Sequence, residues 1–111
     1  MKKTILNKLI RDKVPEIIRK IGDVPEITIL DEADFRQALK TKMTEEVKEL
    51  LAADSIDEIL NELSDVVEVA RAFAADYGLS WEEVEKLRIA KLQAKGGFEK
   101  KLFLKSVEEN T

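Results

Sequence analysis

The chain has 111 residues, a length that favours one domain with a single modest core, and we expect residues 1–111 to form it. It is 44% hydrophobic and 38% charged, a mixture typical of amphipathic helices with densely charged exposed faces. The net charge of −4 argues against a nucleic acid polymer as partner. Cysteine and histidine are both absent, which excludes disulfides, histidine-based acid–base catalysis and Cys/His zinc sites.

The start of the chain does not have the pattern of a secretory leader. In MKKTILNKLIRDK, charges at Lys8, Arg11 and Asp12 interrupt the apolar stretch that a signal peptide needs. No apolar run approaches the roughly 20 residues that cross a bilayer. We therefore expect a cytoplasmic protein that binds neither membranes nor nucleic acid polymers.

The two ends of the chain predict one short helix and two short strands. RDKVPEIIRKIG begins as a loop and becomes a helix, with Pro15 in its first turn and Gly22 as its stop. EITIL, at 26–30, alternates in the manner of a strand, and KKLFLKSV, at 100–107, has a similar pattern. Because a lone strand is not viable, these two segments can pair as a small two-stranded β ribbon.

The centre of the chain predicts two long helices and a shorter third. They cover about residues 32–53, 55–77 and 80–95. Their N-terminal signals are an Asp31 cap and two capping boxes, Ser55 with Glu58 and Ser80 with Glu83. The tight ADS turn at 53–55 makes the two long helices antiparallel neighbours. The expected fold class is therefore mainly α, an antiparallel helical bundle.

A helical wheel places acids on the inward faces of the two long helices. The inward stripe of the first is Leu39, Met43, Val47 and Leu50, and that of the second is Ile59, Leu63, Val66, Val67, Ala70 and Phe73. Glu46 falls inside the first stripe and Glu49 at its edge, while Glu62 falls inside the second and Asp65 at its flank. Four carboxylates are therefore expected to converge on one interhelical groove.

Like charges in a partly dry groove are costly unless they are protonated, paired or bound to a cation. Two interpretations remain open at this point, a cation site or edge glutamates whose carboxylates reach out to solvent. If a cation binds, oxygen-only ligands select a hard ion, Mg²⁺ or Mn²⁺. The absence of histidine argues against a di-iron carboxylate bundle.

EEVKE at 45–49, followed by ELSD at 62–65, resembles the E-E-x-x-E…E-x-x-D signature of the MazG-like all-α nucleoside triphosphate pyrophosphatases. NKLIRDKVPEII before it and KGGFEKKLFL after it resemble flanking segments of a phosphoribosyl-ATP-pyrophosphohydrolase-like branch. The resemblance implies Mg²⁺-dependent hydrolysis of a nucleoside triphosphate, or a related nucleotide such as phosphoribosyl-ATP, to the monophosphate and pyrophosphate. The role would be house-cleaning of nucleotide pools or a biosynthetic step. A non-catalytic helical module that binds nucleotides or proteins is the alternative, although all four acids are intact.

The resemblance also implies roles for single residues. Glu46, Glu49, Glu62 and Asp65 would be metal ligands, and Glu45 would join Glu46 and Glu49 in catalysis by orienting water. Candidate phosphate-binding residues are Lys8, Arg11, Lys13, Lys42, Lys91 and Lys95. The family completes its bundle by pairing subunits, so we expect a homodimer or homotetramer. The base, the number of metal ions, and whether the basic residues act within one chain or across subunits remain open.

Overall fold

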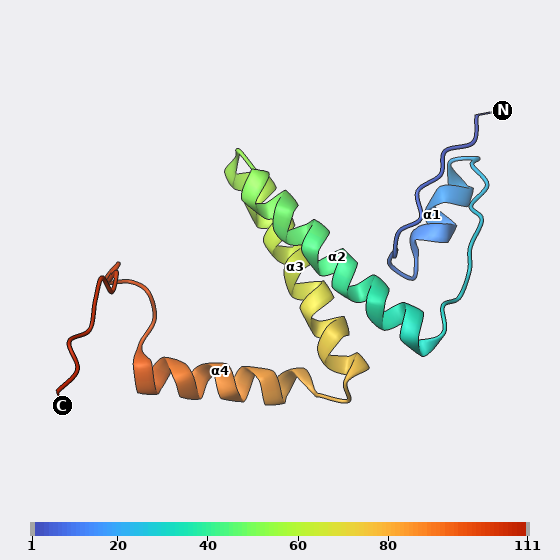
Figure 1. Cartoon of the computed structure of the whole chain (residues 1–111). Helices are drawn as coiled ribbons and strands as arrows, with labels where there is room; N and C mark the ends of the chain where they lie inside the picture. The colour runs from blue at the N-terminus through green and yellow to red at the C-terminus, as the bar shows by residue number, and fades with distance from the viewer. Residues whose placement is uncertain (1, 111) are drawn as a thin grey trace.

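The computed structural model describes residues 2–110, which form four helices joined by turns and extended segments (Figure 1). The helices are α1 (Val14–Lys20), α2 (Glu32–Ala52), α3 (Ile56–Asp76) and α4 (Trp81–Lys95). The mainly helical fold class is confirmed, and the ends of the three longer helices agree with the sequence prediction within about one residue. Residues 1 and 111, the ends of the expected domain, lie outside the described part. None of the described helices is both long and apolar enough to cross a membrane.

Side-chain caps begin the three longer helices. The backbone N–H of Asp34 donates to Asp31 Oδ1 at 2.8 Å. At the start of α4 the capping box is complete, because Ser80 Oγ accepts from the Glu83 N–H while Glu83 Oε2 accepts from the Ser80 N–H.

The cap of α3 differs from the predicted reciprocal box. Ser55 Oγ accepts from the Glu58 N–H at 3.1 Å, as expected. The Glu58 carboxylate instead accepts from the backbone N–H of Asp54, at 3.0 Å. In a capping box, Glu58 would accept from the N–H of Ser55. It accepts instead from the residue before Ser55, and therefore stabilises the turn between α2 and α3.

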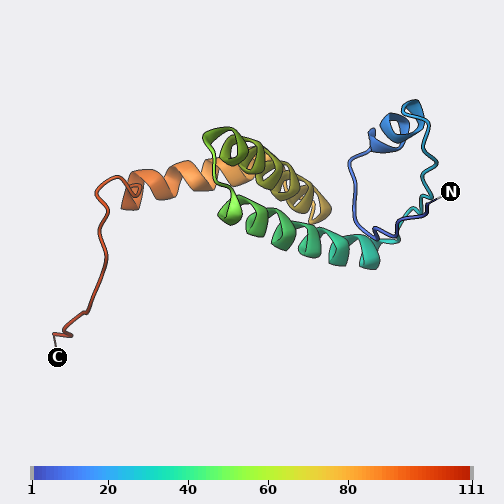
Figure 2. The same ribbon diagram turned by 90° about the horizontal axis from the view of Figure 1, so that it is seen from above.

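Helices α2 and α3 form an antiparallel hairpin, the central unit of the molecule (Figures 1 and 2). Leu39 of α2 is 2% exposed and Ala74 of α3 is 7% exposed, and they form the small apolar core. At the open end of the hairpin, Arg36 donates to the Asp76 carboxylate at 2.7 Å and stands over the ring of Tyr77 at 4.0 Å. The hydrogen bond to Asp76 is the main reason that the pKa of Arg36 is raised above its usual value.

The predicted inward stripe of α3 is too wide. Leu63 and Val67 are 46% and 47% exposed, and Leu60, one turn earlier, is 67% exposed. Helix α2 covers one side of α3, and α4 packs against α3 without covering this row, so residues near the edge of the predicted stripe stay in contact with solvent. We call Leu60, Leu63 and Val67 the outer stripe, an apolar row that α2 does not cover.

The predicted β ribbon is wrong, since residues 2–110 contain no strand. Residues 26–30 lie near the N-terminal segment, where Lys3 Nζ is 3.5 Å from Glu26 Oε2. Residues 100–107 follow α4, which runs away from the N-terminal segment to the far side of the molecule (Figure 1). The direction of α4 therefore keeps the two segments too far apart to pair within one chain.

The chain is extended for its length, with principal extents of 70 × 35 × 25 Å. Its radius of gyration is 19.3 Å, against about 13 Å for a compact domain of this size. Its accessible surface is 10491 Å², against about 6,200 Å² for a folded monomer of this mass. One copy of the chain therefore leaves much of its apolar surface uncovered.

Candidate metal centre

Three acids meet between the two helices of the hairpin. Glu46 and Glu62 lie eight residues on either side of Asp54 in the turn, so an antiparallel hairpin brings them face to face. Glu49 lies one turn from Glu46 on the same helix. One carboxylate oxygen from each of Glu46, Glu49 and Glu62 lies within 4.8 Å of the others. We call these three residues the acidic cluster.

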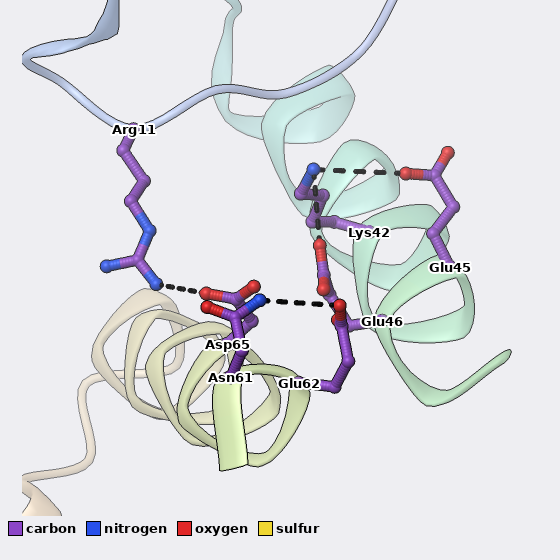
Figure 3. A network of polar contacts seen from close by, with 7 residues as sticks. All are labelled: Arg11, Lys42, Glu45, Glu46, Asn61, Glu62 and Asp65. Carbon is purple, nitrogen blue, oxygen red and sulfur yellow. Dashed lines mark hydrogen bonds and ion pairs between the residues drawn. The ribbon is translucent and has the colours of Figure 1, made fainter. Parts of the chain in front are cut away.

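Two oxygens of the acidic cluster are buried without a hydrogen-bond partner. They are Glu46 Oε2 and Glu62 Oε2. Their companion oxygens do have partners, Lys42 Nζ at 3.4 Å from Glu46 Oε1 and Asn61 Nδ2 at 3.4 Å from Glu62 Oε1 (Figure 3). A buried carboxylate oxygen without a partner is costly, and a hard cation bound by oxygen ligands would remove that cost. The donor set therefore fits Mg²⁺ or Mn²⁺.

Lys42 partly neutralises the rim of the acidic cluster. Its Nζ lies 3.4 Å from Glu46 Oε1 and 4.0 Å from Glu45 Oε2, both on the next turn of α2 (Figure 3). Glu46 is only 6% exposed, and among the described residues Lys42 is the one basic residue that forms an ion pair with its carboxylate. Glu45 lies further out, with a side chain that is 45% exposed, and its predicted role in orienting water stays a prediction. The phosphate-binding role of Lys42 stays a prediction.

Asp65, the fourth acid of the predicted ligand set, does not join the acidic cluster. It lies one turn beyond Glu62 on α3, and its Oδ1 accepts a hydrogen bond from Arg11 Nη2 at 2.8 Å (Figure 3). Arg11 belongs to the segment before α1, which is 54 residues away in the chain. The structure thus pairs Arg11 with an acid of α3, and the predicted phosphate-binding role of Arg11 stays a prediction. The role of Asp65 as a ligand stays a prediction.

In the described part of the chain, none of the other predicted phosphate-binding residues forms an ion pair with an acid of the site. Lys8 and Lys13 are exposed on the N-terminal segment. Lys91 and Lys95 are exposed on α4, which packs against α3 and not against α2 in the described part of the chain. Within one chain, the structure therefore does not bring Lys91 and Lys95 to the carboxylates of α2.

Two contacts of the site were not predicted from the sequence. Asn61 donates to Glu62, and Arg11 pairs with Asp65 across a long stretch of sequence. No local signal exists for the second contact, since it depends on how the N-terminal segment folds back. Asn61 could have been suggested only by its position next to a groove acid, a weak signal in a chain with many polar residues.

Comparison with known proteins places the chain in a family. The sequence profile of phosphoribosyl-ATP pyrophosphohydrolase matches residues 6–91, a range that contains Arg11, the acidic cluster and Asp65. A protein of Mycolicibacterium smegmatis described as uncharacterized is 45% identical over 53 residues, which are 48% of this chain and 54% of that protein. The chain thus spans about half the length of this curated relative. No solved structure matches it. The matched range covers most of the chain, which therefore belongs to the phosphoribosyl-ATP pyrophosphohydrolase family, within the MazG-like superfamily of all-α nucleoside triphosphate pyrophosphatases.

Proposed function

We propose that the chain hydrolyses a nucleoside triphosphate, or a related nucleotide such as phosphoribosyl-ATP, to the monophosphate and pyrophosphate with the help of Mg²⁺. Membership of the family supports pyrophosphohydrolase activity on a nucleotide. The observation that carries the dependence on a metal is the acidic cluster, with its two buried carboxylate oxygens that lack partners. A role in clearing non-standard nucleotides from the cellular pool accords with this chemistry.

The acidic cluster would hold the ion. Glu46, Glu49 and Glu62 supply one oxygen each, and Asp65 is the fourth ligand if its carboxylate turns toward them. When bound, the ion neutralises charge on the phosphates and lowers the pKa of water, so that hydroxide is available for in-line attack on phosphorus. Glu45, whose carboxylate lies beside Lys42 at the rim of the groove, would orient that water. No protein nucleophile is needed, in keeping with a chain that has neither cysteine nor histidine.

Basic residues near the groove would bind the phosphates. Lys42 and Arg11 already lie beside the acids. The planar guanidinium of Arg11 can bind two phosphate oxygens at once, which the ammonium of a lysine cannot do. Lys8 and Lys13 share a segment with Arg11 and could approach a long anionic substrate. Lys91 and Lys95 would act on a second copy of the chain.

We propose further that two chains pair through the outer stripe of α3 into a four-helix bundle. Leu60, Leu63 and Val67 follow helical spacing on the side of α3 that α2 leaves open. The excess of accessible surface over a compact monomer is larger than the roughly 1,600 Å² that a standard protein–protein interface buries. A homodimer, or a homotetramer built from two such pairs, would cover this surface.

A screen for pyrophosphate release tests the proposed reaction. The full chain is incubated with Mg²⁺ and a set of common nucleoside triphosphates, modified nucleoside triphosphates and phosphoribosyl-ATP, and both products are measured. The proposal predicts monophosphate and pyrophosphate in equal amounts for at least one member of the set. Release of orthophosphate and a diphosphate, or no turnover of any member with either Mg²⁺ or Mn²⁺, would contradict it.

A further inference from the structure

Polar contact between the segment before α2 and the helical hairpin depends on one side chain. In the described part of the chain, the hydrogen bonds and ion pairs between residues 2–30 and the hairpin reduce to the contact of Arg11 with Asp65. Helix α1 packs against none of the other described helices. The contact of Lys3 with Glu26 lies within the segment itself. A change in the orientation or charge of Asp65 therefore acts directly on this polar contact with the N-terminal segment.

Asp65 has two competing partners. Its carboxylate lies next to the groove, three residues after Glu62, yet it stands outside the set of oxygens that lie within 4.8 Å of one another. To contribute an oxygen to an ion held by that set, the carboxylate has to turn toward Glu62. Turning moves Oδ1 away from Arg11 Nη2, which now lies at 2.8 Å. Binding of the ion and binding of Arg11 therefore compete for Asp65.

We infer that Arg11 and Asp65 form a latch, which ties the N-terminal segment to α3 and opens when a divalent cation draws Asp65 inward. This inference rests on the proposed function, because it needs a cation in the acidic cluster. Once released, the Arg11 guanidinium is free to pair with an anionic phosphate of the substrate. Arg11 is thus a phosphate-binding residue whose availability depends on the metal.

The latch is weak enough to open. Arg11 is 59% exposed at its side chain, and exposed ion pairs contribute little to stability because water screens them. A further carboxylate ligand stabilises a bound divalent cation much more than a solvated carboxylate stabilises Arg11. The competition should therefore reduce metal affinity by a small factor without preventing binding.

Mn²⁺ binding without nucleotide tests the latch. Free Mn²⁺ is measured by electron paramagnetic resonance during titration of the full chain. Arg11→Gln should tighten Mn²⁺ binding by about two- to fivefold more than Lys13→Gln, since an exposed ion pair is worth about that factor. Lys13→Gln is the matched control, because it removes the same charge from the same segment, and no ion pair involves Lys13 among the described residues. In an Asp65→Asn background, the two substitutions should have equal effects.

Hydrogen exchange gives a second readout that does not depend on affinity. Mn²⁺ should speed exchange of the amides at 8–14 in the wild type. In the Asp65→Asn variant, these amides should exchange faster than those of the wild type even before metal is added. Equal effects of Arg11→Gln and Lys13→Gln in the wild-type background, or exchange that Mn²⁺ leaves unchanged, would overturn the latch alone. Failure of the wild type to bind Mn²⁺ would overturn the metal centre as well.

Discussion

Glu46 of α2 and Glu62 of α3 face each other across the hairpin, and each has one buried carboxylate oxygen without a hydrogen-bond partner. Their positions follow from the turn at Asp54, which lies midway between them in the chain. Two such groups close together repel each other, and their buried oxygens lose solvation, so the pair is unfavourable unless a cation or a proton compensates it.

Removing one of these charges should stabilise the metal-free chain. Glu62→Gln keeps the size of the side chain and relieves repulsion within the acidic cluster, so the free energy of unfolding in EDTA should rise by about 1 kcal/mol. Millimolar Mg²⁺ should raise the melting temperature of the wild type by mass action and have little effect on the variant. Thermal denaturation with and without Mg²⁺ measures both. A wild-type melting temperature that does not change when Mg²⁺ is added would refute this prediction.

Local rules were sufficient to predict the helices. The caps at Asp31 and Ser80, together with Gly78 after α3, fall where their side chains and backbone preferences require. The acidic cluster was also predictable, because a short turn and a period of 3.6 residues determine which positions of a hairpin meet.

Features that depend on distant contacts were not predictable. The β ribbon failed because alternation indicates only that a segment can be a strand, whereas pairing requires a partner that α4 carries elsewhere. The exposure of Leu63 and Val67 follows from the number of helices around α3 in one chain. The partner of Asp65 depends on a loop that returns from 54 residues away. A wheel describes one helix and carries none of this information.

The small core should be sensitive to truncation. Leu39 is 2% exposed, so Leu39→Ala removes buried methyl groups and leaves a cavity, at a cost of about 2–4 kcal/mol. Leu51→Ala, on the same helix at 80% exposure, is the matched control and should change stability by less than about 0.5 kcal/mol. Urea unfolding at one fixed protein concentration compares the two. Similar losses for both variants would show that the buried side of α2 is not the one described.

The outer stripe should hold copies of the chain together. Leu63→Glu places a charge in the middle of that row and should shift the protein from an oligomer toward the monomer, because a desolvated unpaired charge is costly at an interface. Ser64→Glu, at the adjacent exposed position on another side of α3, should leave the assembly intact. Sedimentation velocity at micromolar concentration distinguishes the two. A wild type that sediments as a monomer would rule out pairing through α3.

The most direct test of the metal centre is the rate of Mg²⁺-dependent pyrophosphate release by three proteins, the wild type, Glu49→Gln and Glu68→Gln, on a substrate that the wild type turns over. Glu49 belongs to the acidic cluster, whereas Glu68 is an exposed acid of α3 outside it. Both substitutions remove one negative charge and keep the helices intact. We predict that Glu49→Gln lowers the rate by at least about a hundredfold, as expected for loss of a metal ligand, while Glu68→Gln stays within about twofold of the wild type. Equal rates for the two variants would contradict the assignment of the acidic cluster as the metal centre.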